Sequence, residues 1–313
     1  MNKLNKPRGT QDIYPPRSIL YQKIQQIISR LLQRNNYQLV IFPTFESAEL
    51  FTSTLGSTTD IIHKEMFIFP DRKGRSLALR PEGTAGVVRL VCENKLIQEG
   101  VELINAKGVF ADYQLLKLVT EIFSELGIKD FIFSLNYLGN EETKENYKNK
   151  LKKFIGDKSI DLCKNCQERY QNNPLRILDC SVCKKKDYFP SYKEAWEEKD
   201  REHVNKLDQL LKKFNLPYDY DYNLVRGLDY YTGLVFEVSL GENKALLGGG
   251  SYGKLYQEIG DIDTPALGFA IGIDRLVNYL EASGLSSKLL ANFNKIDVFF
   301  FLSVPEFYPE VLE

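Results

Sequence analysis

The first hydrophobic pattern along the chain is that of a long amphipathic helix. Over residues 17–35 apolar side chains recur every three to four positions, the spacing of one helical face, and Ser18 is a candidate cap near the start. The apolar positions are Leu20, Ile24, Ile27, Ile28, Leu31 and Leu32. Residues 37–43 then form a β-like run whose final Pro43 is typical of a strand end or edge. The pattern predicts a helix followed by a strand.

Short apolar runs later in the chain predict an antiparallel sheet. Residues 66–70 and 76–80 flank a turn that contains Gly74, and so indicate a β-hairpin. The further expected elements are a helix over 114–126, strands over 131–135, 234–239 and 245–247, and a strand that passes into a helix over 266–276. This order favours an α+β fold, with an antiparallel sheet flanked by helices, over a βαβ array.

A change of composition divides the chain. Residues 141–212 are rich in lysine and glutamate and contain helical patches at 142–154 and 193–214. We therefore expect an inserted helical lobe at 141–212, between the two parts of a main domain at 1–140 and 213–290. A strand pattern begins at residue 296, so residues 291–313 look like the start of a further domain.

Composition adds limits but no function. With 313 residues, 43% of them hydrophobic, the chain can bury one large core or two moderate ones. The sequence shows neither a bilayer-length apolar run nor an apolar signal core, so we expect a cytoplasmic protein with no membrane partner. The net charge of -1 argues neither for nor against nucleic acid, because a basic face can exist within a neutral total.

Polar residues concentrate in residues 225–237. Arg226, Asp229, Tyr230 and Tyr231 lie within six residues beside two glycines, and buried charges need partners. The pattern indicates either a polar pocket or a tight turn with solvated charges, and composition alone leaves both open.

Two other stretches could bind a charged ligand. After the hairpin, Pro81 and Gly83 stop the strand and display Glu82 and Thr84, either as partners of an ammonium group or as an exposed strand-to-helix junction. Further on, three consecutive glycines at 248–250 allow close backbone approach, or mark a β-bulge. Gly268 and Gly272 leave space before Arg275, whose fixed charge suits a phosphate.

Together and in this order, these motifs resemble those of the histidyl-tRNA synthetases, which are class II aminoacyl-tRNA synthetases. Residues 6–15 resemble the N-terminal signature of the family, and residues 41–46 resemble the first class II motif, which forms the dimer interface. The likeness covers nearly the whole chain. It implies the class II antiparallel sheet and a homodimer.

The resemblance also implies roles for individual residues. Arg226 would be the catalytic arginine at the α-phosphate of ATP, and Arg275 would bind the γ-phosphate end. Glu82 would hold the α-amino group of histidine. The other residues implied or considered for the histidine pocket are Thr84, Glu102, Tyr230, Tyr231 and Tyr252. Polar partners for imidazole would reject analogues that leave them unpaired.

The implied reaction activates histidine with ATP to histidyl-adenylate and pyrophosphate, with Mg²⁺ as cofactor, and then passes the histidine to tRNA(His). Attack of a carboxylate on an anionic phosphate requires mainly positioning and charge neutralisation. Two arginines at opposite ends of one triphosphate would supply the positive charge, with Mg²⁺ on the outer phosphates.

The sequence departs from the family in several places. Between Gly100 and Val101 a long family segment is absent, and it contains the second arginine of the α-phosphate clamp. Either the protein lacks it and is a weak or inactive synthetase, or the natural protein has residues there that this sequence does not show; the intact pocket motifs favour the latter. Ser251 and Gly253 replace an arginine and an aspartate, and Asp274 replaces a glutamate. From the resemblance we expect residues 291–313 to be the start of a truncated C-terminal anticodon-binding domain.

Four of the five cysteines form two close pairs, Cys163 with Cys166 and Cys180 with Cys183. Two such pairs are typical of a structural Cys₄ zinc site, although their separation is slightly short. Four reduced thiols in a polar insertion are the alternative, and both stay open.

A second function remains possible. A non-catalytic histidine-binding paralogue, similar to the regulatory subunit of ATP phosphoribosyltransferase, would explain the missing segment and the missing C-terminal domain. The intact motifs at 80–84 and 226–231 favour the enzyme.

Overall fold

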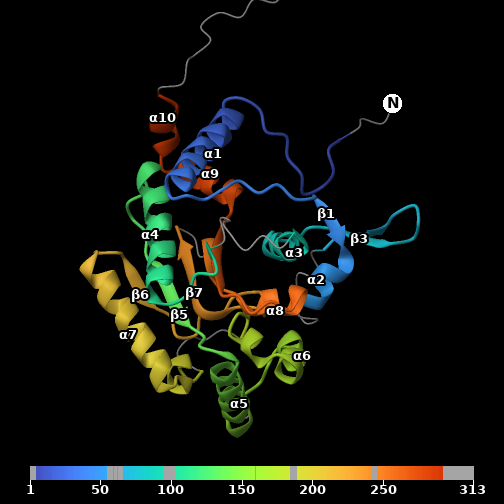
Figure 1. Ribbon diagram of the computed structural model, residues 1–313, viewed down its shortest axis with the longest axis vertical. Coiled ribbons are helices and arrows are strands. Elements are labelled where there is room, and N and C mark those ends of the chain that lie inside the picture. Colours follow the sequence, from blue (N-terminus) through green and yellow to red (C-terminus); the bar gives the residue numbers. More distant parts are fainter. Residues whose placement is uncertain are drawn as a thin grey trace, which may run out of the picture.

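A six-stranded mixed sheet lies at the centre of the computed structural model, which describes residues 5–54, 59, 62, 66–94, 103–158, 160–183, 189–240 and 245–291. In the order β4-β9-β8-β7-β5-β6, neighbouring strands are antiparallel except β5 and β6. The strands are β4 (Leu103–Ile104), β5 (Phe133–Tyr137), β6 (Tyr218–Tyr220), β7 (Thr232–Ser239), β8 (Ala245–Ser251) and β9 (Ala266–Ile271). Helices flank this sheet (Figure 1), and the predicted α+β class is confirmed.

Alternation along β7 gives the sheet two different faces. Leu234, Phe236 and Val238 are buried in one hydrophobic core, whereas Val235 is buried in a second core. Glu237 is only half-buried and points to the same side as Val235. The second face therefore accommodates a charged group among apolar neighbours.

Five helices build the first core together with the sheet. They are α1 (Arg17–Arg34), α4 (Val109–Glu125), α7 (Glu198–Lys213), α9 (Ile273–Ala282) and α10 (Leu285–Leu290). In α1 the buried residues Leu20, Ile24, Ile27 and Leu31 form one stripe, so this helix is confirmed as predicted. Among the described helices, none is long and apolar enough to cross a bilayer.

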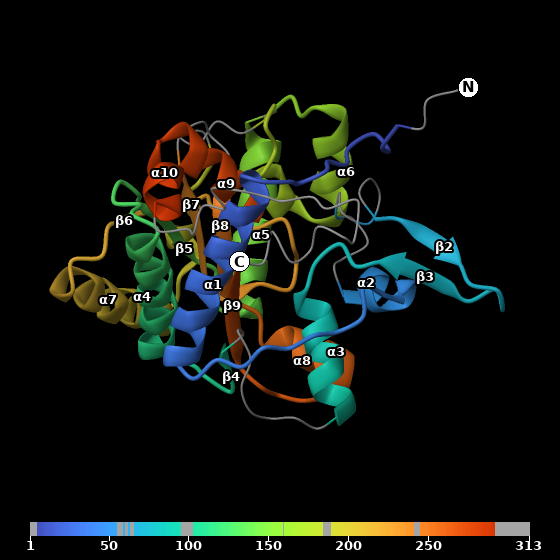
Figure 2. The same ribbon diagram turned by 90° about the horizontal axis from the view of Figure 1, so that it is seen from above.

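The second core joins helices that are far apart in the sequence. They are α2 (Ala48–Thr54), α3 (Thr84–Asn94), α5 (Glu141–Asp157), α6 (Lys164–Asn172) and α8 (Lys254–Gly260). Helices α3 and α8 pack on each other, and Figure 2 shows them on the opposite side of the molecule from α4 and α7. Residues before and after 141–212 thus share one core.

A smaller sheet projects from the body of the protein (Figure 2). It consists of β1 (Phe45–Ser47), β3 (Ser76–Leu79) and β2 (Ile68–Pro70) in that order, all antiparallel. The β2–β3 pairing confirms the predicted hairpin. Its exposed apolar side chains are Phe45, Phe67, Ile68, Phe69 and Leu79.

Several sequence predictions were wrong in detail. Helix α1 begins directly after Pro16, so Ser18 lies within its first turn and is not the cap. Residues 37–43 form no strand, since Leu39 and Ile41 are 85% and 83% exposed and no described strand pairs with them; the strand is β1, just beyond. The strand predicted at 131–135 lies two residues later as β5.

Other predictions are modified or fall outside the described residues. The helix expected over 193–214 is split into a short 3₁₀ turn, η3 (Tyr192–Ala195), and helix α7. The three glycines do not interrupt β8 but lie within it. Glu102, the strand expected from 296 and nearly all of 291–313 lie outside the described part of the chain.

Candidate functional site

Small residues form an open floor on strands β8 and β9. Gly248 pairs with Ala270 and Gly250 pairs with Gly268. Directly paired residues share one face of a sheet, as do residues two apart on a strand, so all four lie on the same face. A Cβ atom at Gly250 would stand 2.4 Å from the carbonyl oxygen of Leu234, so only glycine fits there. This floor leaves space for larger groups above it.

Arg226 lies over this floor. A Cβ atom at Gly248 would stand 2.4 Å from Nη1 of Arg226. The same nitrogen donates to the carboxylate of Glu237, which is paired with Gly248 across the β7–β8 ladder. Burial lowers the pKa of Arg226, but Tyr231 and Glu237 raise it further, so the pKa lies above its usual value. The guanidinium is a fixed positive charge held on the sheet.

Glu82 occupies the turn between β3 and α3. Its carboxylate accepts the backbone N–H groups of Thr84 at 2.6 Å and of Ala85 at 2.8 Å. The Tyr230 hydroxyl lies 3.5 Å from the same carboxylate. Burial nevertheless raises the pKa of Glu82 above its ordinary value. A half-buried carboxylate with remaining acceptor capacity is suited to an ammonium group.

Three buried tyrosines connect Glu82 to the floor. Tyr230 contacts Tyr231, with ring centroids 4.9 Å apart, and Tyr252, with centroids 6.0 Å apart. The ring of Tyr231 in turn lies 3.0 Å from where a Cβ of Gly250 would stand. The carboxylate of Glu82, the three tyrosine rings and the guanidinium of Arg226 therefore form one continuous group of side chains on this face of the sheet.

Arg275 reaches the same strand from helix α9. Its guanidinium is exposed and donates to the carbonyl oxygen of Ala245, the first residue of β8. Ala245 and Gly248 are three residues apart, or about 10 Å along a strand. Arg226 and Arg275 thus both contact β8. Asp274 beside Arg275 instead accepts hydrogen bonds from Gln11 and Tyr21.

Glu237 is a residue of this group that the sequence pattern did not single out, although it lies in the polar stretch 225–237. The available signal was a charged residue between Phe236 and Val238 in an otherwise apolar strand. Glu237 becomes interpretable only through its pairing with Gly248 across the ladder.

The four clustered cysteines come from two neighbouring segments. Cys163 and Cys166 lie at the start of α6, and Cys180 and Cys183 follow the 3₁₀ turn η2 (Pro174–Ile177). Their sulfur atoms all lie within 4.8 Å of one another, and Sγ of Cys163 is 3.7 Å from Sγ of Cys180. Sulfurs bound to one tetrahedral zinc at about 2.3 Å are about 3.8 Å apart. The backbone N–H groups of Cys163 and Cys183 each donate to a cysteine sulfur at 3.4 Å. The predicted cluster exists, and its donors fit zinc.

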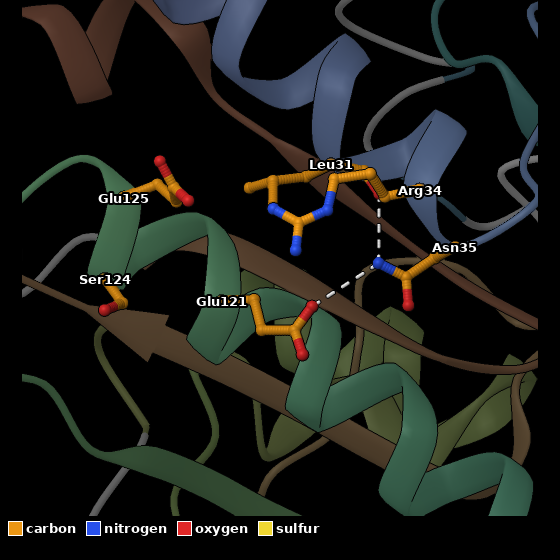
Figure 3. A pocket seen from close by; sticks show the side chains of 6 residues that line it. All are labelled: Leu31, Arg34, Asn35, Glu121, Ser124 and Glu125. Carbon is orange, nitrogen blue, oxygen red and sulfur yellow. Dashed lines mark hydrogen bonds between the residues drawn. The ribbon is translucent and has the colours of Figure 1, made fainter.

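Another hollow lies between α1 and α4 (Figure 3). It is lined by Leu31, Arg34, Asn35, Glu121, Ser124 and Glu125. Nδ2 of Asn35 donates to the carbonyl oxygen of Leu31 at 3.0 Å and lies 3.4 Å from a carboxylate oxygen of Glu121. These residues belong to none of the signature motifs, so this hollow is separate from the candidate site.

Comparison with known proteins gives a consistent result. The family model described as histidyl-tRNA synthetase matches residues 9–96 and 91–276. A histidine–tRNA ligase of Anoxybacillus flavithermus is 38% identical in an alignment of 318 positions that spans 90% of this chain and 75% of that relative. A solved structure of apo histidyl-tRNA synthetase from S. aureus is 30% identical, with a TM-score of 0.74 over 90% of this chain and 75% of that one.

A more distant structure shares the fold alone. It is an ATP phosphoribosyltransferase regulatory subunit/histidyl-tRNA synthetase from Bacillus halodurans C, 21% identical, with a TM-score of 0.66 over 92% of this chain and 90% of that one. The two stretches matched by the family model meet at residues 91–96, close to Gly100. The family model therefore matches this chain in two parts, and the two parts meet close to Gly100, after which a long segment of the family has no counterpart in this sequence.

Proposed function

Because this chain belongs to the histidyl-tRNA synthetase family, we propose that it activates histidine with ATP to histidyl-adenylate and transfers histidine to tRNA(His). The observation that carries the proposal is the tyrosine-lined site with the Glu82 carboxylate at one end and the Arg226 guanidinium at the other. One end suits the ammonium group of an amino acid, and the other suits a phosphate. We place this reaction in the cytoplasm.

Arg226 is the proposed catalytic residue. Its guanidinium would neutralise the α-phosphate as the histidine carboxylate attacks, and Glu237 would give up its place on the guanidinium to the phosphate. Arg275, about 10 Å along β8, would bind the outer phosphates, whose remaining charge a Mg²⁺ ion bound to ATP would neutralise. The glycine floor would let the nucleotide approach the sheet.

Glu82 is proposed to bind the α-amino group of histidine. The N–H groups of Thr84 and Ala85 fix the direction of its carboxylate. Tyr230, Tyr231 and Tyr252 would enclose the imidazole, with Glu102 as the remaining candidate partner. Specificity would follow because a smaller or apolar side chain leaves these polar groups unpaired.

We further propose a structural zinc ion on Cys163, Cys166, Cys180 and Cys183. Support comes from the 3.7 Å separation of two sulfurs and from the two backbone N–H groups directed at sulfur. Zinc would tie α6 to the segment after η2 and would take no part in the chemistry.

A homodimer through the small sheet is also proposed. Phe67 on the hairpin is 72% exposed, and Leu39 and Ile41, which precede β1 in the sequence, are 85% and 83% exposed. An apolar area of this kind on a projecting sheet is typical of a contact surface. The resemblance of residues 41–46 to the first class II motif supports the same surface.

The decisive experiment is histidine-dependent exchange of pyrophosphate into ATP by the whole protein. We expect exchange in the natural protein and a loss on the order of 3 kcal/mol of transition-state stabilisation in Arg226→Ala, as when a preorganised charge is removed. Histidine binding without any exchange would overturn the proposal.

The absent segment near Gly100 favours a second candidate, a non-catalytic histidine-binding paralogue. In the described residues, strand β9 pairs on its outer side only at Ala266 and Leu267, with the two-residue strand β4. On this outer side, Gly268 and Ala270 have no described strand next to them. Binding of histidine with no exchange would support this candidate.

A further inference from the structure

We propose that Lys144 and Arg176, two buried cations from residues 141–212, are positioning residues that hold the main chain of residues 226–231 in its reactive shape. The proposal rests on the function proposed above, because residues 226–231 carry Arg226, Tyr230 and Tyr231. The signature motifs include neither cation.

Residues 226–231 need such support. They connect β6 to β7 and belong to no helix or strand, so no regular ladder fixes their carbonyl groups. Buried carbonyl groups require donors. The described structure supplies them from side chains of α5 and η2.

Lys144 supports the tyrosine end. It lies in the first turns of α5, and its side chain is only 6% exposed. Its ammonium group donates to the carbonyl oxygen of Asp229 at 3.2 Å, to that of Tyr231 at 3.0 Å, and to the carboxylate of Glu141 at 3.0 Å. All three N–H donors of the ammonium group are therefore used.

Arg176 supports the arginine end. Its side chain is 5% exposed, and Nη1 donates to the carbonyl oxygen of Arg226 at 3.3 Å. The same nitrogen lies 3.5 Å from where a Cβ of Gly227 would stand, so the guanidinium packs directly on this main chain. Asp179 lies 3.8 Å away and partly balances the charge.

The two cations act at different ends of one short segment. Lys144 holds the main chain of Tyr231, whose ring lies beside Tyr230 and above Gly250. Arg176 holds the main chain of Arg226, whose guanidinium is the proposed phosphate ligand. Loss of Lys144 should therefore affect histidine binding, and loss of Arg176 should affect the chemical step. A purely structural role would not separate the two effects.

The test combines hydrogen exchange with kinetics on the full chain. In Lys144→Met we expect faster amide exchange confined to residues 224–231, and a KM for histidine raised about tenfold with little change in the KM for ATP. In Arg176→Met we expect kcat for pyrophosphate exchange to fall about tenfold with a nearly unchanged histidine KM, and Arg176→Lys should restore part of it.

The matched control is Lys148→Met. Lys148 lies one turn further along α5 and pairs with Glu145, and no described contact joins it to residues 226–231. The Lys148→Met variant should leave amide exchange at residues 224–231 and the kinetic constants unchanged. Unaltered amide exchange at 224–231 in Lys144→Met and Arg176→Met would overturn the proposal. An equal loss of protection from amide exchange throughout α5 and α7 would also overturn it, because that result indicates destabilisation of the whole fold.

The two proposals fail separately. If the natural protein exchanged no pyrophosphate, the proposed function would fall, yet the amide-exchange comparison would still decide whether Lys144 and Arg176 hold this segment. If the natural protein were active and both variants matched it in kinetics and amide exchange, only the positioning role would fall.

Discussion

The guanidinium of Arg226 occupies the space that a side chain at Gly248 would need: a Cβ there would stand 2.4 Å from Nη1. Gly248→Ala should therefore displace Arg226 from the sheet, because atoms in a folded core do not approach so closely. We expect pyrophosphate exchange to fall at least tenfold, with a loss of only about 1 kcal/mol of stability, because only the flexible end of the Arg226 side chain has to move. Exchange assays and thermal unfolding would measure the two effects.

Gly156→Ala is the matched control for this substitution. Gly156 lies within α5, and a Cβ there would meet only the hydroxyl of Tyr170, at 3.9 Å. Alanine favours a helix by up to about 1 kcal/mol over glycine, so this variant should be slightly more stable and fully active. A Gly248→Ala protein as active as Gly156→Ala would contradict the close contact.

Local sequence patterns were sufficient to predict many of the helices and strands. The stripe of Leu20, Ile24, Ile27 and Leu31 predicts α1 because its spacing matches the helical turn, and Gly74 between two β runs predicts the hairpin. The prediction of a strand over residues 37–43 was wrong because a β-like composition does not show whether a neighbouring strand is available for pairing. A strand requires a neighbour that composition does not reveal.

The candidate site was predicted through its motifs but not through its supports. Arg226 and the tyrosines stand out because polar residues are concentrated there. Lys144 does not, because it lies in a lysine-rich segment where no local signal separates a buried lysine from solvated ones. Its role depends on contacts with Asp229 and Tyr231, more than 80 residues away.

Glu82 should make histidine binding depend on pH. Burial raises its pKa above the ordinary 4.5, so the folded protein holds this proton more tightly than the unfolded chain. Rising pH through that raised pKa should therefore lower stability while it creates the carboxylate that binds the ammonium group. Histidine affinity, measured by calorimetry between pH 4 and pH 8, should rise with pH.

Glu82→Gln separates this effect from titration of the histidine ligand itself, whose imidazole ionises near pH 6.5. The variant should bind weakly at every pH, and its thermal stability should vary less with pH over the window above 4.5. Parallel affinity profiles for the two proteins would show that Glu82 does not titrate in the binding reaction.

Removal of one cysteine ligand should release the proposed zinc. Cys166 is fully buried in the cluster, and Cys166→Ser should lower zinc, measured by elemental analysis, from about one ion per chain to almost none. Loss of a structural metal is among the few changes that cost more than about 3 kcal/mol of stability, so unfolding should occur at markedly lower temperature.

Cys92→Ser is the control, because Cys92 is a free cysteine outside the cluster. It should leave the zinc content unchanged. Natural protein purified without zinc, and with the same melting temperature before and after chelation, would mean that the four sulfurs are simply reduced thiols.

The partly buried His203 and the buried Asp112 form a pair that should support the fold rather than the reaction. Nε2 of His203 lies 2.6 Å from the Asp112 carboxylate, which is 4% exposed, and the imidazole stacks on Tyr137 at 4.7 Å. His203→Ala would leave the buried Asp112 carboxyl group without this hydrogen-bond partner, at a cost of about 1–3 kcal/mol in urea unfolding. Lys206→Ala, on the exposed side of the same helix, should cost less than about 0.5 kcal/mol. Equal unfolding midpoints for the two variants would contradict a structural role, because breaking a buried pair exposes a desolvation penalty that a solvated pair does not have.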